Sequence, residues 1–338
     1  MLRAILGSMP RSRPISRPIR FFLLCLASSC LISCAGSPAA APTQSAEIPP
    51  GSLWLEVDGA SLHYSHGLPG GLARARVLLI HGFGASTDCW RFLAPALLEA
   101  GYEVVEVDWP PFGWSMAPRR GTDPDYSLIG RPEATARLLW SFLDAIPGSG
   151  PGPWIVVGHS MGGRIGAWMA SQRPASTRAL VLIAPATLGT IGAPALGASP
   201  LFRSALKRNL GRYLSDPAFV ASSLARAYGR KPRPEETRAY QAPLLRPGAQ
   251  AELLSWTVTA SERKEPPFAA IDCPCLILWG TRDRIVKNQG SRLAGLLPSS
   301  TYIPYPGGGH VLMETEEGKV SADVLAFLAA QGEPKAGP

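Results

Sequence analysis

Ten residues from Trp154 to Gly163, WIVVGHSMGG, give the clearest structural signal in the chain. The apolar run that begins at Trp154 is typical of a strand buried on both faces, and the residues after Met161 fit a helix. Between them, the pattern Gly-x-Ser-x-Gly predicts that Ser160 lies on a sharp strand-to-helix turn. Flanking side chains would clash in such a turn, so Gly158 and Gly162 are required. The stretch therefore predicts a serine nucleophile at the positive end of a helix.

Apolar runs on both sides of this stretch alternate with helical patterns. Alternating units of this kind predict an α/β fold with a mostly parallel sheet flanked by helices. The expected strands are Leu53–Val57, Val77–Ile80, Glu103–Val107, Trp154–Val157, Leu180–Ile183, Leu276–Trp279 and Thr301–Tyr305. The expected helices are Cys89–Ala100, Pro132–Ala145, Met161–Gln172, Val286–Leu297 and Gly318–Ala330.

One interval, from about Ala186 to Phe268, breaks the alternation because it contains helical segments and proline breaks but no convincing strand. We interpret residues 186–268 as a helical cap inserted into a core formed by residues 51–185 and 269–332. The cap holds twelve basic and six acidic residues, a net charge of +6. Such a charge could face an anionic membrane, but a solvated helical surface is the favoured interpretation.

A nucleophilic serine needs a base that accepts its proton and an acid that orients the base. Of the five histidines, His310 follows the last expected strand in a glycine-rich loop, where an imidazole can reach the sheet edge. Asp283 follows the strand before it. The predicted triad is therefore Ser160, Asp283 and His310, in the chain order typical of one hydrolase arrangement. Asp108 is the competing acid and fits a turn or a helix cap better; Asp272 precedes its strand.

The developing oxyanion of such a reaction needs fixed donors. One expected donor is the N–H group of Met161, the residue after the nucleophile. The other is the N–H group of Phe83, in the loop His81-Gly82-Phe83-Gly84 that follows an early strand. We expect His81 to hold this loop rather than to take part in the chemistry. Plausible pocket aromatics are Trp109, Phe112, Trp114 and Trp256, although core packing is the better explanation for each of them singly.

The N-terminus has the pattern of a secretory signal, with five arginines before a short apolar run and no acidic residue. Its end, Leu31-Ile32-Ser33-Cys34, resembles the bacterial lipobox, whereas Ala27–Cys30 matches less well. That resemblance implies removal of residues 1–33, lipidation of Cys34 and a flexible tether over residues 34–50. The protein would then be a membrane-anchored lipoprotein of the bacterial cell envelope. The alternative is an ordinary signal with incidental cysteines.

Composition limits the remaining choices. The content of 46% hydrophobic and 17% charged residues suits a folded protein. Removal of five arginines lowers the net charge from +8 to +3, and no basic helix with interleaved aromatics suggests nucleic acid. The remaining Cys89, Cys273 and Cys275 lack the spacing of a zinc site, and we expect buried thiols. Nothing in the sequence indicates a metal or an organic cofactor, and the oligomeric state stays open.

Five motifs together resemble the α/β-hydrolase superfamily, in its serine esterase and lipase branch with a helical cap. They are HGFGAS, DWPPFGWS, GHSMGG, LILWGTRDRIV and GGGH, and the resemblance covers Leu53 to Ala330. It implies cleavage of carboxylic esters, possibly of lipids, through an acyl-enzyme. Pro111 stands where the family usually has glycine, so that loop could differ in shape. Ser160 argues against dehalogenases and epoxide hydrolases, which use an aspartate.

The same triad would also serve a C–C bond hydrolase, an amidase or a cofactor-free peroxidase-like enzyme, because fold does not decide among them. A non-catalytic envelope binding protein on the same scaffold is the alternative from another class.

Overall fold

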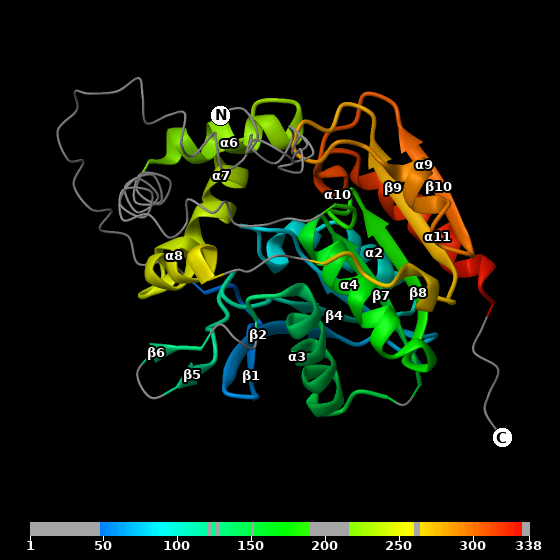
Figure 1. The fold of residues 1–338 in the computed structure, drawn as a ribbon, viewed down its shortest axis with the longest axis horizontal. Coiled ribbons are helices and arrows are strands. Elements are labelled where there is room, and N and C mark those ends of the chain that lie inside the picture. Colours follow the sequence, from blue (N-terminus) through cyan, green and yellow to red (C-terminus); the bar gives the residue numbers. More distant parts are fainter. Residues whose placement is uncertain are drawn as a thin grey trace, which may run out of the picture.

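The computed structural model describes residues 48–120, 123–125, 129–150, 152–189, 216–259 and 264–332. Its centre is an eight-stranded sheet in the order β1-β2-β4-β3-β7-β8-β9-β10 (Figure 1). From β4 to β10 all neighbours are parallel, whereas β1 and β2 form an antiparallel hairpin at one edge. The strands are β1 (Leu53–Val57), β2 (Ala60–Gly67), β3 (Arg76–Ile80), β4 (Glu103–Val107), β7 (Trp154–His159), β8 (Thr177–Ile183), β9 (Cys275–Gly280) and β10 (Ser300–Tyr305). This is the α/β-hydrolase fold that the sequence predicts.

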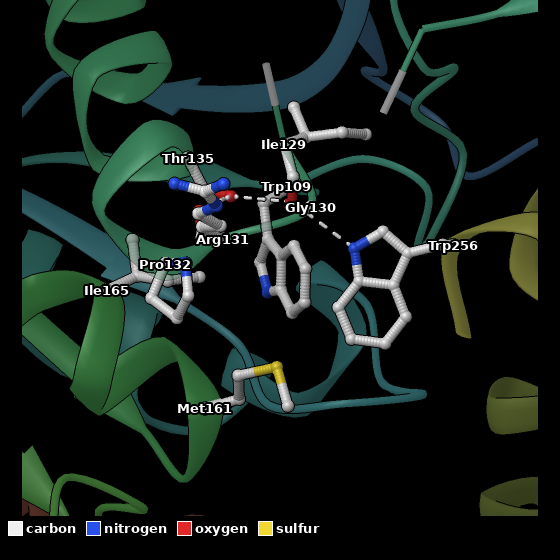
Figure 2. A pocket seen from close by; sticks show the side chains of 9 residues that line it. All are labelled: Trp109, Ile129, Gly130, Arg131, Pro132, Thr135, Met161, Ile165 and Trp256. Carbon is white, nitrogen blue, oxygen red and sulfur yellow. Dashed lines mark hydrogen bonds between the residues drawn. The ribbon is translucent and has the colours of Figure 1, made fainter. Parts of the chain in front are cut away.

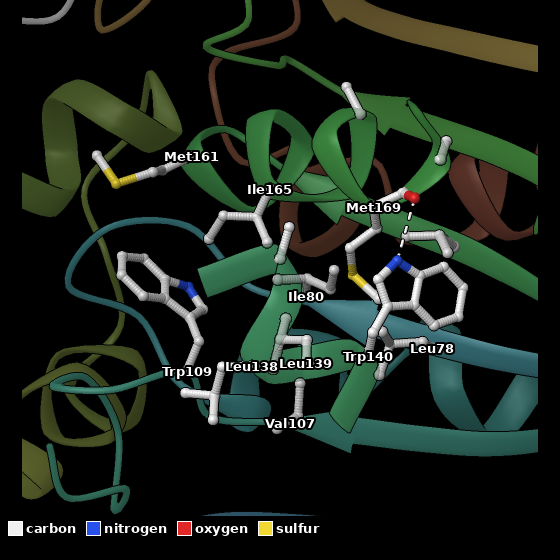
Figure 3. Close-up of a cluster of buried hydrophobic side chains, with 14 of the residues drawn as sticks. Leu78, Ile80, Val107, Trp109, Leu138, Leu139, Trp140, Met161, Ile165 and Met169 are labelled. Carbon is white, nitrogen blue, oxygen red and sulfur yellow. Dashed lines mark hydrogen bonds between the residues drawn. The ribbon is translucent and has the colours of Figure 1, made fainter. Parts of the chain in front are cut away.

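Helices cover both faces of the sheet because successive strand residues point to opposite sides. Leu78 and Ile80 of β3 pack in one apolar cluster with α3 (Pro132–Ala145) and α4 (Met161–Gln172). Figure 3 shows this cluster, in which the indole nitrogen of Trp140 donates to Met169 O at 3.1 Å. Val77 and Leu79, which alternate with Leu78 and Ile80 along β3, pack in a second cluster on the other face. The helices of that face are α2 (Leu93–Glu99) and α11 (Glu317–Ala330).

Several helices follow β8 and precede β9, in the interval that we interpret as a cap. They are α6 (Pro217–Tyr228), α7 (Pro234–Gln241), the 3-10 helix η6 (Ala242–Leu245) and α8 (Ala249–Thr259), which Figure 1 shows grouped on one side of the molecule. Asp216 caps α6 by accepting from Ala218 N at 2.9 Å. Residues 190–215 and 260–263 lie outside the described residues, so the cap boundaries at 186 and 268 stay predictions.

Short elements complete the described chain. They are η2 (Thr87–Trp90), β5 (Arg119–Arg120), β6 (Asp123–Pro124), η4 (Pro174–Ser176), η7 (Phe268–Ala270), α9 (Gly290–Ala294) and α10 (Leu312–Thr315). The predicted signal, Cys34 and nearly all of the tether also lie outside the described residues. Within the described ranges, no helix is both long enough and apolar enough to cross a membrane.

Two helix predictions need correction. The helix expected at Val286–Leu297 is only α9, because side chains bind the backbone before it: Asp283 accepts from Val286 N and Asn288 from Gly290 N. Such local hydrogen bonds compete with helix formation. The helix expected at Cys89–Ala100 is divided into η2 and α2. By contrast, α3 and α4 have the predicted bounds.

Candidate active site

The turn at Ser160 has the strained conformation that the glycine pattern predicts. Ser160 has φ of 51° and ψ of −113°, and a positive φ is uncommon for a residue with a side chain. Neighbouring strands hold it there, since Ser160 N donates to Ile183 O at 3.0 Å and Ala186 N donates to Ser160 O at 2.8 Å. Strain of this kind persists only where the surroundings enforce it, and it is frequent at active sites.

Two glycines let the predicted oxyanion loop press against this turn. A Cβ atom on Gly162 would lie 2.1 Å from Ile80 O, and one on Gly82 would lie 3.1 Å from the Cβ of Ser160. Because Phe83 follows Gly82 and Met161 begins α4, both predicted donor residues flank the serine. The segments that carry the two N–H groups are therefore packed close to the serine turn, as the predicted oxyanion site requires.

The predicted base and acid are in contact. His310 Nδ1 donates to Asp283 Oδ2 at 2.7 Å, and the Asp283 side chain is fully buried. The same carboxylate also accepts from Ile285 N at 2.8 Å, Val286 N at 2.9 Å and the indole nitrogen of Trp279 at 3.1 Å. These donors fix the carboxylate, so it orients the imidazole and leaves Nε2 as the nitrogen that can accept a proton.

His159 joins the loop of His310 to the serine turn, a contact that sequence reasoning missed. Its Nε2 donates to the backbone oxygen of His310 at 3.0 Å, and the two rings lie 4.7 Å apart between centroids. Burial, together with the neighbouring His310, holds the pKa of His159 well below its ordinary value. His159, the residue before Ser160, is therefore a neutral anchor for the loop of His310.

Asp108, the competing acid, has a structural place. Its carboxylate accepts from Trp114 N at 2.8 Å and from Thr87 N, which begins η2, at 2.7 Å. His63 Nδ1 donates to it at 2.7 Å. His81 lies beside it: its Nδ1 donates to Gly82 O at 2.7 Å, and burial lowers its pKa. These contacts fit a turn residue and a loop-holding histidine. Asp272 is exposed before β9.

A narrow hollow, too small to hold a water molecule, lies beside Met161 (Figure 2). Two of the predicted aromatics, Trp109 and Trp256, line it, and the indole nitrogen of Trp256 donates to Ile129 O at 3.2 Å. The others lie outside its lining. Phe112 packs edge-on against Phe83 at 5.0 Å, and Trp114 is buried elsewhere in the same loop. The remaining lining residues are Ile129, Gly130, Arg131, Pro132, Thr135 and Ile165.

The thiols of Cys89, Cys273 and Cys275 are buried and form no disulfide. In the part of the chain that the structure describes, no group of three His, Cys, Asp or Glu residues could hold a metal ion.

Comparison with known proteins finds relatives among hydrolases. The hydrolase YugF of Bacillus subtilis (strain 168), itself uncharacterised, is 26% identical over 285 residues, which cover 80% of this chain and 96% of that protein. A 2-hydroxy-6-oxononadienedioate/2-hydroxy-6-oxononatrienedioate hydrolase of Dechloromonas aromatica (strain RCB) is 29% identical over 270 residues, 75% of this chain and 86% of its own. The crystal structure of a membrane phospholipase A, described as a bacterial virulence factor, superposes with a TM-score of 0.64 at 26% identity. It covers 83% of this chain and 86% of its own.

The family match covers most of the described core. The model of the alpha/beta hydrolase fold matches residues 75–317, which include the loop at Phe83, the turn at Ser160 and both Asp283 and His310. The order of the strands and the match to the family model both indicate the same fold, and the chain belongs to the alpha/beta hydrolase fold family.

Proposed function

We propose that the protein is a serine hydrolase that cleaves carboxylic esters through an acyl-enzyme intermediate. The observation that supports this most directly is the pair of His310 and Asp283, 2.7 Å apart and bound through His159 to the strained turn of Ser160. A nucleophile, a base and an orienting acid in this arrangement suit acyl transfer.

In the first half of the reaction, Ser160 Oγ attacks the ester carbonyl carbon while His310 Nε2 takes the hydroxyl proton. Asp283 stabilises the imidazolium, and the N–H groups of Phe83 and Met161 stabilise the oxyanion. His310 then gives the proton to the leaving alcohol as the carbon–oxygen bond breaks. In the second half, water attacks the acyl-enzyme with His310 again as the base, which releases the acid and restores Ser160.

The substitution Ser160→Ala tests this assignment. We expect it to abolish hydrolysis of p-nitrophenyl esters and labelling by a fluorophosphonate probe, while circular dichroism shows an unchanged fold. The matched control is Ser52→Ala, because Ser52 also lies beside a histidine and an aspartate. Undiminished turnover by the Ser160 variant would exclude it as the nucleophile, and a wild-type protein that takes no label at Ser160 would favour a non-catalytic binding protein.

A C–C bond hydrolase is the second candidate, because a relative with 29% identity is named for that activity. Activity on a 2-hydroxy-6-oxodienoate that exceeds activity on every ester tested would favour it. No observation in this chain favours an amidase or a peroxidase-like enzyme.

Lipid esters are the proposed substrate class within ester hydrolysis. The superposition on a membrane phospholipase A supports this choice. A series of p-nitrophenyl esters from acetyl to palmitoyl tests it: rising activity with chain length indicates a lipase, and preference for acetyl or butyryl indicates a short-chain esterase.

We further propose that lipidated Cys34 anchors the enzyme at the bacterial cell envelope, with the cap of residues 186–268 above the site. The lipobox-like sequence Leu31–Cys34 supports the anchor. The mass of the N-terminal peptide from the membrane fraction tests it, since an unmodified Cys34 would contradict the proposal.

A further inference from the structure

A buried carboxylate links the helices after β8 to the loop that holds His310. Glu314, in α10, has a fully buried side chain only four residues after His310. Its oxygens accept from two tyrosine hydroxyls, Tyr228 at 2.8 Å and Tyr240 at 2.6 Å. Arg91 Nη1 lies 2.6 Å from the same carboxylate. A buried carboxylate with two hydroxyl donors and a guanidinium is well satisfied.

The four residues come from four separate segments of the chain. Tyr228 ends α6 and Tyr240 lies in α7, both in the proposed cap, whereas Glu314 belongs to α10 of the core. Arg91 follows η2, a few residues after the predicted oxyanion loop. The group therefore joins cap helices to the segments on either side of the serine.

Backbone contacts extend this junction to His310 itself. His310 N donates to Ala227 O, in the last turn of α6, at 2.7 Å. A Cβ atom on Gly309 would lie 2.6 Å from the same oxygen, so the end of α6 is in close contact with the loop. The position of α6 and the position of His310 are thus held by one set of contacts.

We propose that Glu314, Tyr228 and Tyr240 form a joint through which the cap positions His310, so that loss of the joint misplaces the base. They are positioning residues, because none of them lies in the triad. The inference rests on the proposed role of His310 as the base. A displacement of about 1 Å at a reacting group can lower the rate by roughly 100-fold, so a small change at this joint has a large effect.

The double variant Tyr228→Phe/Tyr240→Phe tests the joint, because it removes two hydroxyls and keeps both rings. We expect kcat for a p-nitrophenyl ester to fall roughly 10- to 100-fold with little change in KM. The matched control is Tyr305→Phe, since the Tyr305 hydroxyl also donates to a carboxylate, Asp323, at 2.6 Å but contacts no cap helix through it. The control should lose some stability, because one hydrogen bond to a carboxylate is removed, and keep its kcat.

Hydrogen–deuterium exchange gives a readout that does not depend on ester hydrolysis. In the double variant, we expect faster exchange both in α6 and in residues 306–316, and neither change in Tyr305→Phe. Exchange that rises in α6 alone, or a double variant with wild-type kcat, would overturn the proposal. If the wild-type protein hydrolyses no ester, the proposed function fails, and the paired exchange still decides whether the joint exists.

Discussion

The described part of the chain contains two sets of a serine, a histidine and an aspartate. In one set, His310 Nδ1 donates to Asp283 at 2.7 Å, and His159, next to Ser160, binds the backbone of His310. In the other, His63 Nδ1 donates to Asp108 at 2.7 Å, and His63 Nε2 lies 2.8 Å from Ser52 Oγ. Judged by these distances alone, the second set is an equally good candidate for nucleophilic chemistry.

The two serines differ in their backbone conformation, and the hydroxyl of Ser52 has an acceptor other than the histidine. Ser52 Oγ donates to Pro49 O at 2.6 Å, so its proton is directed away from the ring of His63. Among the described residues with a side chain, only Asp58, Ser160 and Ala184 have a positive φ, and Ser52 is not one of them. The strained turn therefore belongs to one serine only.

The surroundings differ as well. A Cβ atom on Gly162, two residues after Ser160, would collide with the backbone of β3, whereas one on Gly51, beside Ser52, would meet nothing within 4 Å. No backbone segment is thus packed beside Ser52 in the way that the Phe83 loop is packed beside Ser160. A hydrogen-bonded Ser-His-Asp set is therefore not sufficient for catalysis, because the oxyanion also needs fixed N–H donors beside the serine.

The histidines should separate the two sets most strongly. We expect His310→Gln to lower kcat roughly 10⁴- to 10⁶-fold, because glutamine cannot act as the base. His63→Gln should keep kcat within a few-fold and lower the thermal midpoint, since its role is to bind Asp108 and Ser52. Steady-state kinetics and thermal unfolding of both variants measure this. A large loss of kcat in the His63 variant would show that the second set also serves the chemistry.

The sequence could predict the set of Ser160, Asp283 and His310 because the features of this set are local. A buried strand, paired glycines and a histidine after the last strand are each visible within a few residues of sequence. Helices α3 and α4 were predicted with their full bounds for the same reason, because their apolar spacing is a local pattern. The contact of His159 with His310 and the joint at Glu314 were missed. Their partners are 151, 86 and 74 positions apart, and such pairings leave no periodic trace in the sequence. The helix predicted at Val286–Leu297 was wrong because apolar spacing does not register the side-chain bonds of Asp283 and Asn288.

A glutamate near the second set should make stability, rather than activity, depend on pH. Burial, with a contribution from the charge of Asp108, raises the pKa of Glu106 from 4.5 to about 7. Between these values the folded chain keeps a proton that the unfolded chain has lost, so this contribution to stability falls as pH rises from 4.5 to about 7.

The variant Glu106→Gln should remove that pH dependence. Glutamine can still accept the hydrogen bond that Ser65 Oγ donates to Glu106. Relative to wild type, we expect the free energy of unfolding of the variant to be about 2 kcal/mol larger near pH 8 than near pH 5, so that the variant gains stability at the higher pH. Urea unfolding at the two pH values measures the difference, and parallel curves for the two proteins would contradict it.

The smallest effect should come from the second serine itself. Ser52→Ala removes the hydroxyl that lies between His63 Nε2 and Pro49 O, and it leaves the bond of His63 to Asp108 in place. Because Ser52 is only partly buried, water can replace part of the loss, and we expect about 1 kcal/mol of destabilisation. Turnover and fluorophosphonate labelling should match those of the wild type. A variant that loses activity without losing stability would mean that Ser52 influences the reaction through Asp108 and the neighbouring His81 loop.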